Sequence, residues 1–334
     1  MAAIGAGLQS DSTAGSAHTN SPCRVVIVHD PRAMVTYFPQ PDRIEAMVER
    51  ALTRLVDQPT VSAAWRSLVT TGEVIGIKVE SKLGPQFGTR LPVVEGLVKS
   101  LLAAGWPATN IIIWDRHQAD LQRAGFESLA LRHGVQLAGS ADEGYDPEVF
   151  YESPLLGTLL WGDLEYGQHQ PGAGRKSYVS RLLTRRLTRI VVVSPLVAHP
   201  HAGVMGLLYS LARASVDNFL RFEGEAERLA RAVPEICALP VLGDRVVLCV
   251  VDALLCQYLG GSRGLLHYSS ELNEIRMSRD PVALDILSLR ELERQRRVLG
   301  IAYPPVSREL YENAALLELG IGDPARIEVI TLHR

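Results

Sequence analysis

The sequence predicts an α/β protein with a mixed or mainly parallel sheet and helices on both of its faces. Short apolar runs such as 111–114 and 190–193 are strand-sized, and they are too short to be buried helices. Segments with apolar residues at helical spacing, such as 41–56 and 91–104, alternate with these runs. This alternation is typical of parallel strands that are buried on both faces of a sheet.

Residues 23–139 supply the first strands and helices. The apolar runs predict strands at 24–28, 74–79, 111–114 and 134–137. The helical spacing predicts helices at 41–56, at 91–104 and from about residue 119. Pro92 stands in the first turn of the second helix and Gly105 follows its end, which are common boundary residues of helices.

The pattern is interrupted at 140–180, where Gly, Tyr, Asp and Pro are scattered. This segment is either an insertion that covers a site or a plain surface excursion. Beyond it, strands are expected at 190–193, 245–252 and 327–332, and helices at 207–220 and 281–297, the last with Pro281 at its start. The region 23–334 is one α/β domain, with 23–189 and 190–334 as possible lobes.

Composition excludes several classes of protein. The net charge of -3 gives no reason to expect nucleic acid as a partner, and no apolar run reaches the roughly 20 residues of a membrane span. The cysteines form no C-x-x-C pair, so no iron–sulfur cluster is expected. Residues 1–22 are expected to be a disordered tail or the remnant of an export signal. Localisation would be periplasmic if the true start lies upstream, and otherwise cytoplasmic.

The segment 190–206 holds the strongest candidate site. A strand at 190–193 is expected to turn at Ser194-Pro195 and lead into a loop with His199 and His201. Alternate residues of an extended segment point the same way, so both rings can converge on one divalent metal. The alternative is a pair of histidines that are hydrogen-bonded to the backbone.

Polar residues follow other predicted strands, and strand ends are where ligand sites lie in α/β proteins. Asp115 and His117 follow the third strand, where Asp115 either orients a histidine or caps a helix. Lys78 lies within the second strand. It is expected either to pair with Glu80 or to bind a carboxylate or phosphate.

The C-terminal half contributes three further aspartates. Asp252 ends a predicted strand and is the better candidate for the site. Asp280 and Asp285 flank a helix start, where Asp280 precedes Pro281 and is expected to be the N-cap.

Four segments in this order resemble the bacterial domain-of-unknown-function family 362 over about residues 24–332. They are Gly76–Glu80, Leu91–Asp115, Ser194–Asn218 and Ser278–Asp285. The resemblance implies an α/β protein that is frequently exported and has no settled general chemistry. Val79-Glu80, Val197 and Tyr209-Ser210 stand where the family usually has Asn or Lys, which puts its usual anionic ligand in doubt.

A more distant resemblance, to nickel-pincer lactate racemases, lies around His201 and in Asp115-Arg116-His117. The lysine that attaches their cofactor has no counterpart near 208–211, so that cofactor is not expected.

We therefore expect an enzyme, assisted by a divalent metal, that acts on a small anionic molecule. His199, His201 and Asp115 would be catalytic, with the two histidines as metal ligands. Lys78, Glu80, His117 and Asp252 would bind the ligand. The alternatives are a non-catalytic protein that binds a metal or small ligand, and a degenerate relative kept for protein interaction. The sequence indicates neither the substrate nor the oligomeric state.

Overall fold

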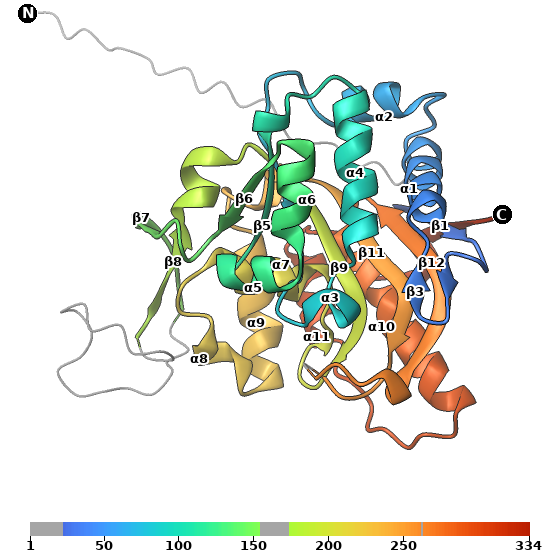
Figure 1. Cartoon of the computed structure of the whole chain (residues 1–334). Coiled ribbons are helices and arrows are strands. Elements are labelled where there is room, and N and C mark those ends of the chain that lie inside the picture. Colours follow the sequence, from blue (N-terminus) through green and yellow to red (C-terminus); the bar gives the residue numbers. More distant parts are fainter. Residues whose placement is uncertain (1–22, 154–173, 262) are drawn as a thin grey trace, which may run out of the picture.

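The computed structural model describes residues 23–153, 174–261 and 263–334, which form a central nine-stranded sheet with helices on both faces (Figure 1). The order of the strands is β13 (Ile327–His333), β1 (Cys23–His29), β12 (Ser269–Ser278), β11 (Val246–Gln257), β9 (Arg189–His199), β4 (Ile75–Lys78), β5 (Ile111–Asp115) and β6 (Gln136–Gly139). The short β10 (Gly203–Val204) pairs with β9. In the order from β13 to β6, β12 is antiparallel to both of its neighbours, β1 and β11. The remaining neighbouring pairs are parallel. The predicted mixed, mainly parallel α/β fold is confirmed.

Two separate apolar cores cover the two faces of the sheet. The first is built with α1 (Pro41–Leu55), α2 (Val61–Leu68), α4 (Leu91–Ala103) and α6 (Phe126–His133). The second is built with α7 (Leu207–Ser215), α8 (Leu220–Glu223), α9 (Ala226–Cys237), α10 (Pro281–Val298) and α11 (Glu309–Leu316). The short α3 (Gly84–Phe87) and α5 (Gln118–Arg123) follow β4 and β5.

Helix boundaries follow the signals in the sequence. In α1, Pro41 occupies the first turn, and Ile44, Met47 and Val48 are buried at helical spacing. In α10, Asp280 is the N-cap, and its side chain accepts a hydrogen bond from the backbone N–H of Ala283 at 2.8 Å. The prediction for Asp280 is therefore correct.

The main corrections concern the strands that carry the candidate site. β9 does not turn at Ser194-Pro195 but continues to His199. Its pairing with β4 ends at Val192, so Pro195 removes no hydrogen bond from that side of the sheet. β11 likewise runs on to Gln257, which places Asp252 inside the strand and not at its end.

Other elements escaped the prediction. Among the helices these are α2, α9 and α11, although Leu229, Val233 and Ile236 of α9 recur at helical spacing. Among the strands these are β12 and the small antiparallel pairs of β2 (Met34–Val35) with β3 (Phe38–Pro39) and of β7 (Tyr145–Glu152) with β8 (Lys176–Ser180). The last pair lies in the irregular 140–180 segment, of which 154–173 is outside the described residues, as is the predicted tail at 1–22.

The described helices include none that is long and apolar enough to cross a membrane. One continuous sheet takes strands from both 23–189 and 190–334, because β1 lies between β12 and β13.

Candidate functional site

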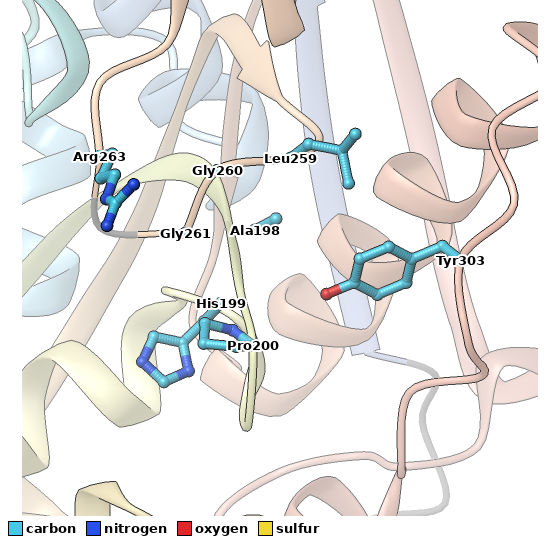
Figure 2. A pocket seen from close by; sticks show the side chains of 8 residues that line it. All are labelled: Ala198, His199, Pro200, Leu259, Gly260, Gly261, Arg263 and Tyr303. Carbon is cyan, nitrogen blue, oxygen red and sulfur yellow. The ribbon is translucent and has the colours of Figure 1, made fainter.

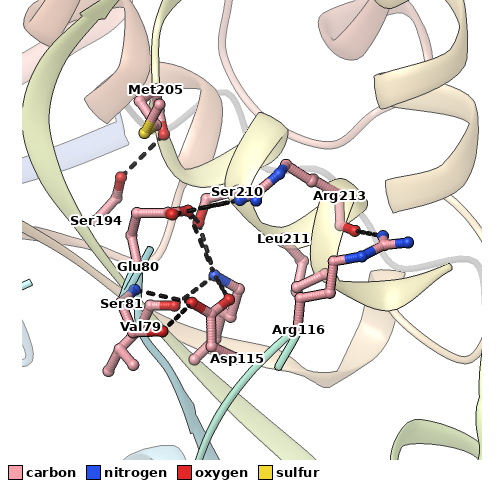
Figure 3. A network of polar contacts seen from close by, with 12 residues as sticks. Val79, Glu80, Ser81, Asp115, Arg116, Ser194, Met205, Ser210, Leu211 and Arg213 are labelled. Atoms are coloured by element: carbon pink, nitrogen blue, oxygen red, sulfur yellow. Dashed lines mark hydrogen bonds and ion pairs between the residues drawn. The ribbon is translucent and has the colours of Figure 1, made fainter. Parts of the chain in front are cut away.

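A buried network of charges lies where β4 and β5 end at the same edge of the sheet (Figure 3). The buried Nζ of Lys78 lies 3.0 Å from Oδ1 of Asp115 and 4.0 Å from Oε2 of Glu80. It also donates hydrogen bonds to the backbone oxygen of Val79 at 2.5 Å and to Oγ of Ser210 at 2.8 Å. The ammonium group of Lys78 thus donates two hydrogen bonds and lies beside two carboxylates, so the side chain is held as a structural cation.

Helix α7 completes this network from the other side. Ser210 donates to Oε2 of Glu80 at 3.2 Å, and Nη1 of Arg213 lies 3.3 Å from both carboxylate oxygens of Glu80. Asp115 accepts two hydrogen bonds from Ser81, from the backbone N–H at 2.8 Å and from the hydroxyl at 2.6 Å. We call Lys78, Glu80, Asp115, Ser210 and Arg213 the Lys78 network.

The charges of the Lys78 network stabilise one another. Burial raises the pKa of Asp115, but Lys78, Arg213 and the hydrogen bonds from Ser81 outweigh burial and hold that pKa below its usual value. Burial lowers the pKa of Arg213, whereas Glu80 and Asp115 raise it to a net value above the ordinary one. Two cations therefore balance two carboxylates in a region that is almost entirely buried.

His199 is the last residue of β9 and only 7% exposed. Its Nδ1 accepts hydrogen bonds from the backbone N–H groups of His201 at 3.3 Å and Ala202 at 3.0 Å, which places the proton of the neutral ring on Nε2. Burial, with smaller contributions from His201 and Arg213, lowers the pKa of His199 to about 4. The ring is therefore neutral at neutral pH.

Tyr209 connects His199 to the Lys78 network. The rings of His199 and Tyr209 are tilted against each other, with centroids 4.4 Å apart. The Tyr209 hydroxyl donates to Oε1 of Glu223 at 2.9 Å, and the same oxygen lies 3.5 Å from Nε of Arg213. His199 thus adjoins the network through packing and not through a direct hydrogen bond.

Of the other predicted site residues, His117 and Asp252 lie apart from this arrangement, whereas His201 contacts His199. His117 is exposed at the start of α5, and Asp252 is buried in an ion pair with Arg90, at 2.9 Å from both its Nη1 and its backbone N–H. The centroid of the His201 ring lies 6.3 Å from that of His199. Across residues 23–153, 174–261 and 263–334, no group of three or more His, Cys, Asp or Glu side chains is placed to hold a metal.

A pocket of about 290 Å³ adjoins His199 at the carboxyl ends of β9 and β11 (Figure 2). We call it the β9–β11 pocket; it is lined by Ala198, His199, Pro200, Leu259, Gly260, Gly261, Arg263 and Tyr303. Gly260 and Gly261 both have positive φ, at 96° and 55°, a conformation that favours glycine. In Figure 2 the His199 ring points away from Tyr303, whereas the Tyr303 hydroxyl points toward the side of the pocket formed by His199 and Pro200.

The sequence analysis did not identify Tyr209 and Arg213 of α7 as site residues, nor the role of Asp285 at the start of this helix. Tyr209 and Arg213 are four residues apart, so they share one side of the helix, and this spacing was the available signal. The start of α7 is held by the buried Asp285, which accepts from the backbone N–H groups of Leu207 at 2.8 Å and Leu208 at 3.1 Å. Burial raises the pKa of Asp285 to about 7 in spite of these two hydrogen bonds.

Comparison with known proteins adds little about the site. No protein-family model matches the sequence, and no curated protein matches it. A crystal structure of a Thermotoga maritima protein from the Northeast Structural Genomics Consortium is similar, with 12% identity and a TM-score of 0.43. The match covers 81% of this chain and 61% of that protein, so this chain spans less than two thirds of that protein's length.

We expect the substitution Asp115→Asn to lower the free energy of unfolding by about 3 kcal/mol, because it leaves Lys78 buried beside a neutral group. Urea denaturation measures the change, with Asp244→Asn, an exposed aspartate, as the control. A decrease in the free energy of unfolding of Asp115→Asn by less than about 1 kcal/mol would contradict the assignment of Lys78 to a buried ion pair.

The lowered pKa of His199 also predicts how stability depends on pH. The unfolded ring binds a proton near pH 6.5 and the folded ring only near pH 4, so stability is lost as the pH falls through this range. When the pH is lowered from 7 to 5, we expect the free energy of unfolding of the wild type to fall by about 2 kcal/mol more than that of His199→Gln. Denaturant unfolding at both pH values tests this, with the exposed His117→Gln as control; equal losses in wild type and His199→Gln would refute it.

Proposed function

We propose that the protein binds a small anionic molecule in the β9–β11 pocket. The observation that supports this proposal is that Arg263, an exposed residue, turns its side chain to the pocket and has neither a side-chain hydrogen bond nor an ion pair among the described residues. The carboxyl ends of parallel strands are the usual place for ligands in α/β proteins. A pocket of about 290 Å³ is at the small end of the range for ligand sites.

The pocket combines three kinds of contact for such a ligand. Arg263 supplies a positive charge, Tyr303 a hydroxyl group, and Leu259 with Pro200 an apolar surface. The turn at Gly260-Gly261 lets the backbone come close to a bound molecule. The Lys78 network, in contrast, has its charges balanced internally, and we propose that it acts as a support for α7.

We expect small carboxylates or inorganic phosphate to bind to the wild type, and Arg263→Gln to weaken that binding about tenfold through the loss of a charge-assisted hydrogen bond. Isothermal titration calorimetry at constant ionic strength measures both affinities. Arg66→Gln changes an exposed arginine in α2 and is the matched control. Equal affinities for wild type and Arg263→Gln would contradict the proposal.

A second candidate function is a divalent metal bound by His199 and His201, which would assist chemistry on the anion. The observation in its favour is the contact of the His199 and His201 rings, whose centroids lie 6.3 Å apart, together with the neutral state of His199. To ligate a metal through Nδ1, the His199 ring would have to give up its two hydrogen bonds from the backbone. The described residues offer two imidazoles, short of the three protein ligands typical of catalytic zinc sites. Any such metal would therefore be held weakly by the protein alone.

Equilibrium dialysis against Zn²⁺ and Ni²⁺, followed by elemental analysis, tests this candidate. We expect one equivalent of metal in the wild type and a loss of at least about tenfold in affinity in the double variant His199→Ala/His201→Ala. His117→Ala/His267→Ala removes two exposed histidines and is the control. Equal binding in the wild type and the His199→Ala/His201→Ala variant would exclude this pair as the site.

A further inference from the structure

Arg296, near the end of α10, is a buried cation without a carboxylate partner. It is 4% exposed, and none of the described carboxylates lies within ion-pair distance of it. Its Nη2 atom is buried and has no hydrogen-bond partner among the described residues. An unpaired buried charge is costly, so this arrangement calls for an explanation.

Four other arginines are buried among the described residues. One of them, Arg221, donates hydrogen bonds to Oγ of Ser177 and to the backbone oxygen of Gly174, and the other three lie beside carboxylates. Nη1 of Arg90 lies 2.9 Å from Asp252, and Nη1 of Arg213 lies 3.3 Å from Glu80. Nη2 of Arg276 lies 2.6 Å from Glu274. Each of these guanidinium groups has a carboxylate of the chain beside it, and Arg296 differs from them in this respect.

The acidic residues nearest to Arg296 on α10 are already paired elsewhere. Glu293 lies 3.5 Å from Nη2 of Arg308. Glu291 lies 2.7 Å from Arg294 and 3.9 Å from Arg276. These pairs leave α10 without a free carboxylate for Arg296 in this arrangement.

Arg296 contacts two walls of the β9–β11 pocket. Its Nε donates to the backbone oxygen of Tyr258 at 2.8 Å, next to Leu259 of the lining. Its guanidinium carbon lies 3.7 Å from the centroid of the Tyr303 ring, which forms another wall. The guanidinium is thus one contact removed from the pocket, and a ligand in the pocket would reach it if the Tyr303 ring moved aside.

We propose that the β9–β11 pocket is specific for a small dicarboxylate, with one carboxylate at Arg263 and the other at Arg296. This inference rests on the proposed function. Arg263 and Tyr303 lie on different sides of the pocket in Figure 2, so the two cations suit two separated negative charges better than one. A carboxylate at Arg296 would supply the acceptor that Nη2 lacks in the described structure.

The test compares dicarboxylates with monocarboxylates of the same carbon number. Malonate, succinate and glutarate are titrated against propionate, butyrate and valerate by calorimetry at constant ionic strength. In the wild type we expect at least one dicarboxylate to bind about tenfold more tightly than its partner, because it makes a second charge-assisted contact. In Arg296→Gln this preference is expected to disappear, while Arg66→Gln keeps it.

The outcomes separate this inference from the proposed function. If both classes bind equally and Arg263→Gln weakens both, the anion pocket stands and the role of Arg296 is refuted. If neither class binds, both proposals fail. A preference that persists in folded Arg296→Gln also refutes the role of Arg296. Should Arg296→Gln fail to fold, Arg296→Lys keeps the charge, and the comparison within the wild type alone still decides whether dicarboxylates are preferred.

Discussion

The ion pair between Lys78 and Asp115 is the contact on which the candidate site depends. It joins the ends of β4 and β5, and burial makes either charge costly without the other. Glu80, which adds a second buried carboxylate, needs Arg213 and Ser210 of α7 to balance it. The charges therefore fix the position of α7, and α7 in turn places Tyr209 against His199.

Much of the fold could be predicted from the sequence, because strand-sized apolar runs and helical spacing are local signals. The helix at 91–104 and the strand at 111–114 both lie within a residue of α4 and β5. The ends of β9 could not be predicted in this way. Pro195 indicates a turn in isolation, and it fits a strand here because β4 ends before reaching it.

The site was less predictable than the fold, because a side chain's role depends on what faces it in space. Lys78 was expected to be paired or ligand-bound, and its partner at 3.0 Å is Asp115, 37 residues later in the chain. Asp252 was expected at a strand end and instead neutralises Arg90. The unusual environment of Arg296 depends on the lack of a carboxylate beside it among the described residues, which a linear sequence cannot reveal.

The order of the strands also determines when β1 can pair with its neighbours during translation. β1 is the first element of the sheet to be made, yet its two neighbours, β12 and β13, come from residues 269–278 and 327–333. β1 must therefore remain without these partners until residues 269–278 and 327–333 have been translated. Until then, the unpaired backbone groups of this apolar strand are open to pairing with other chains.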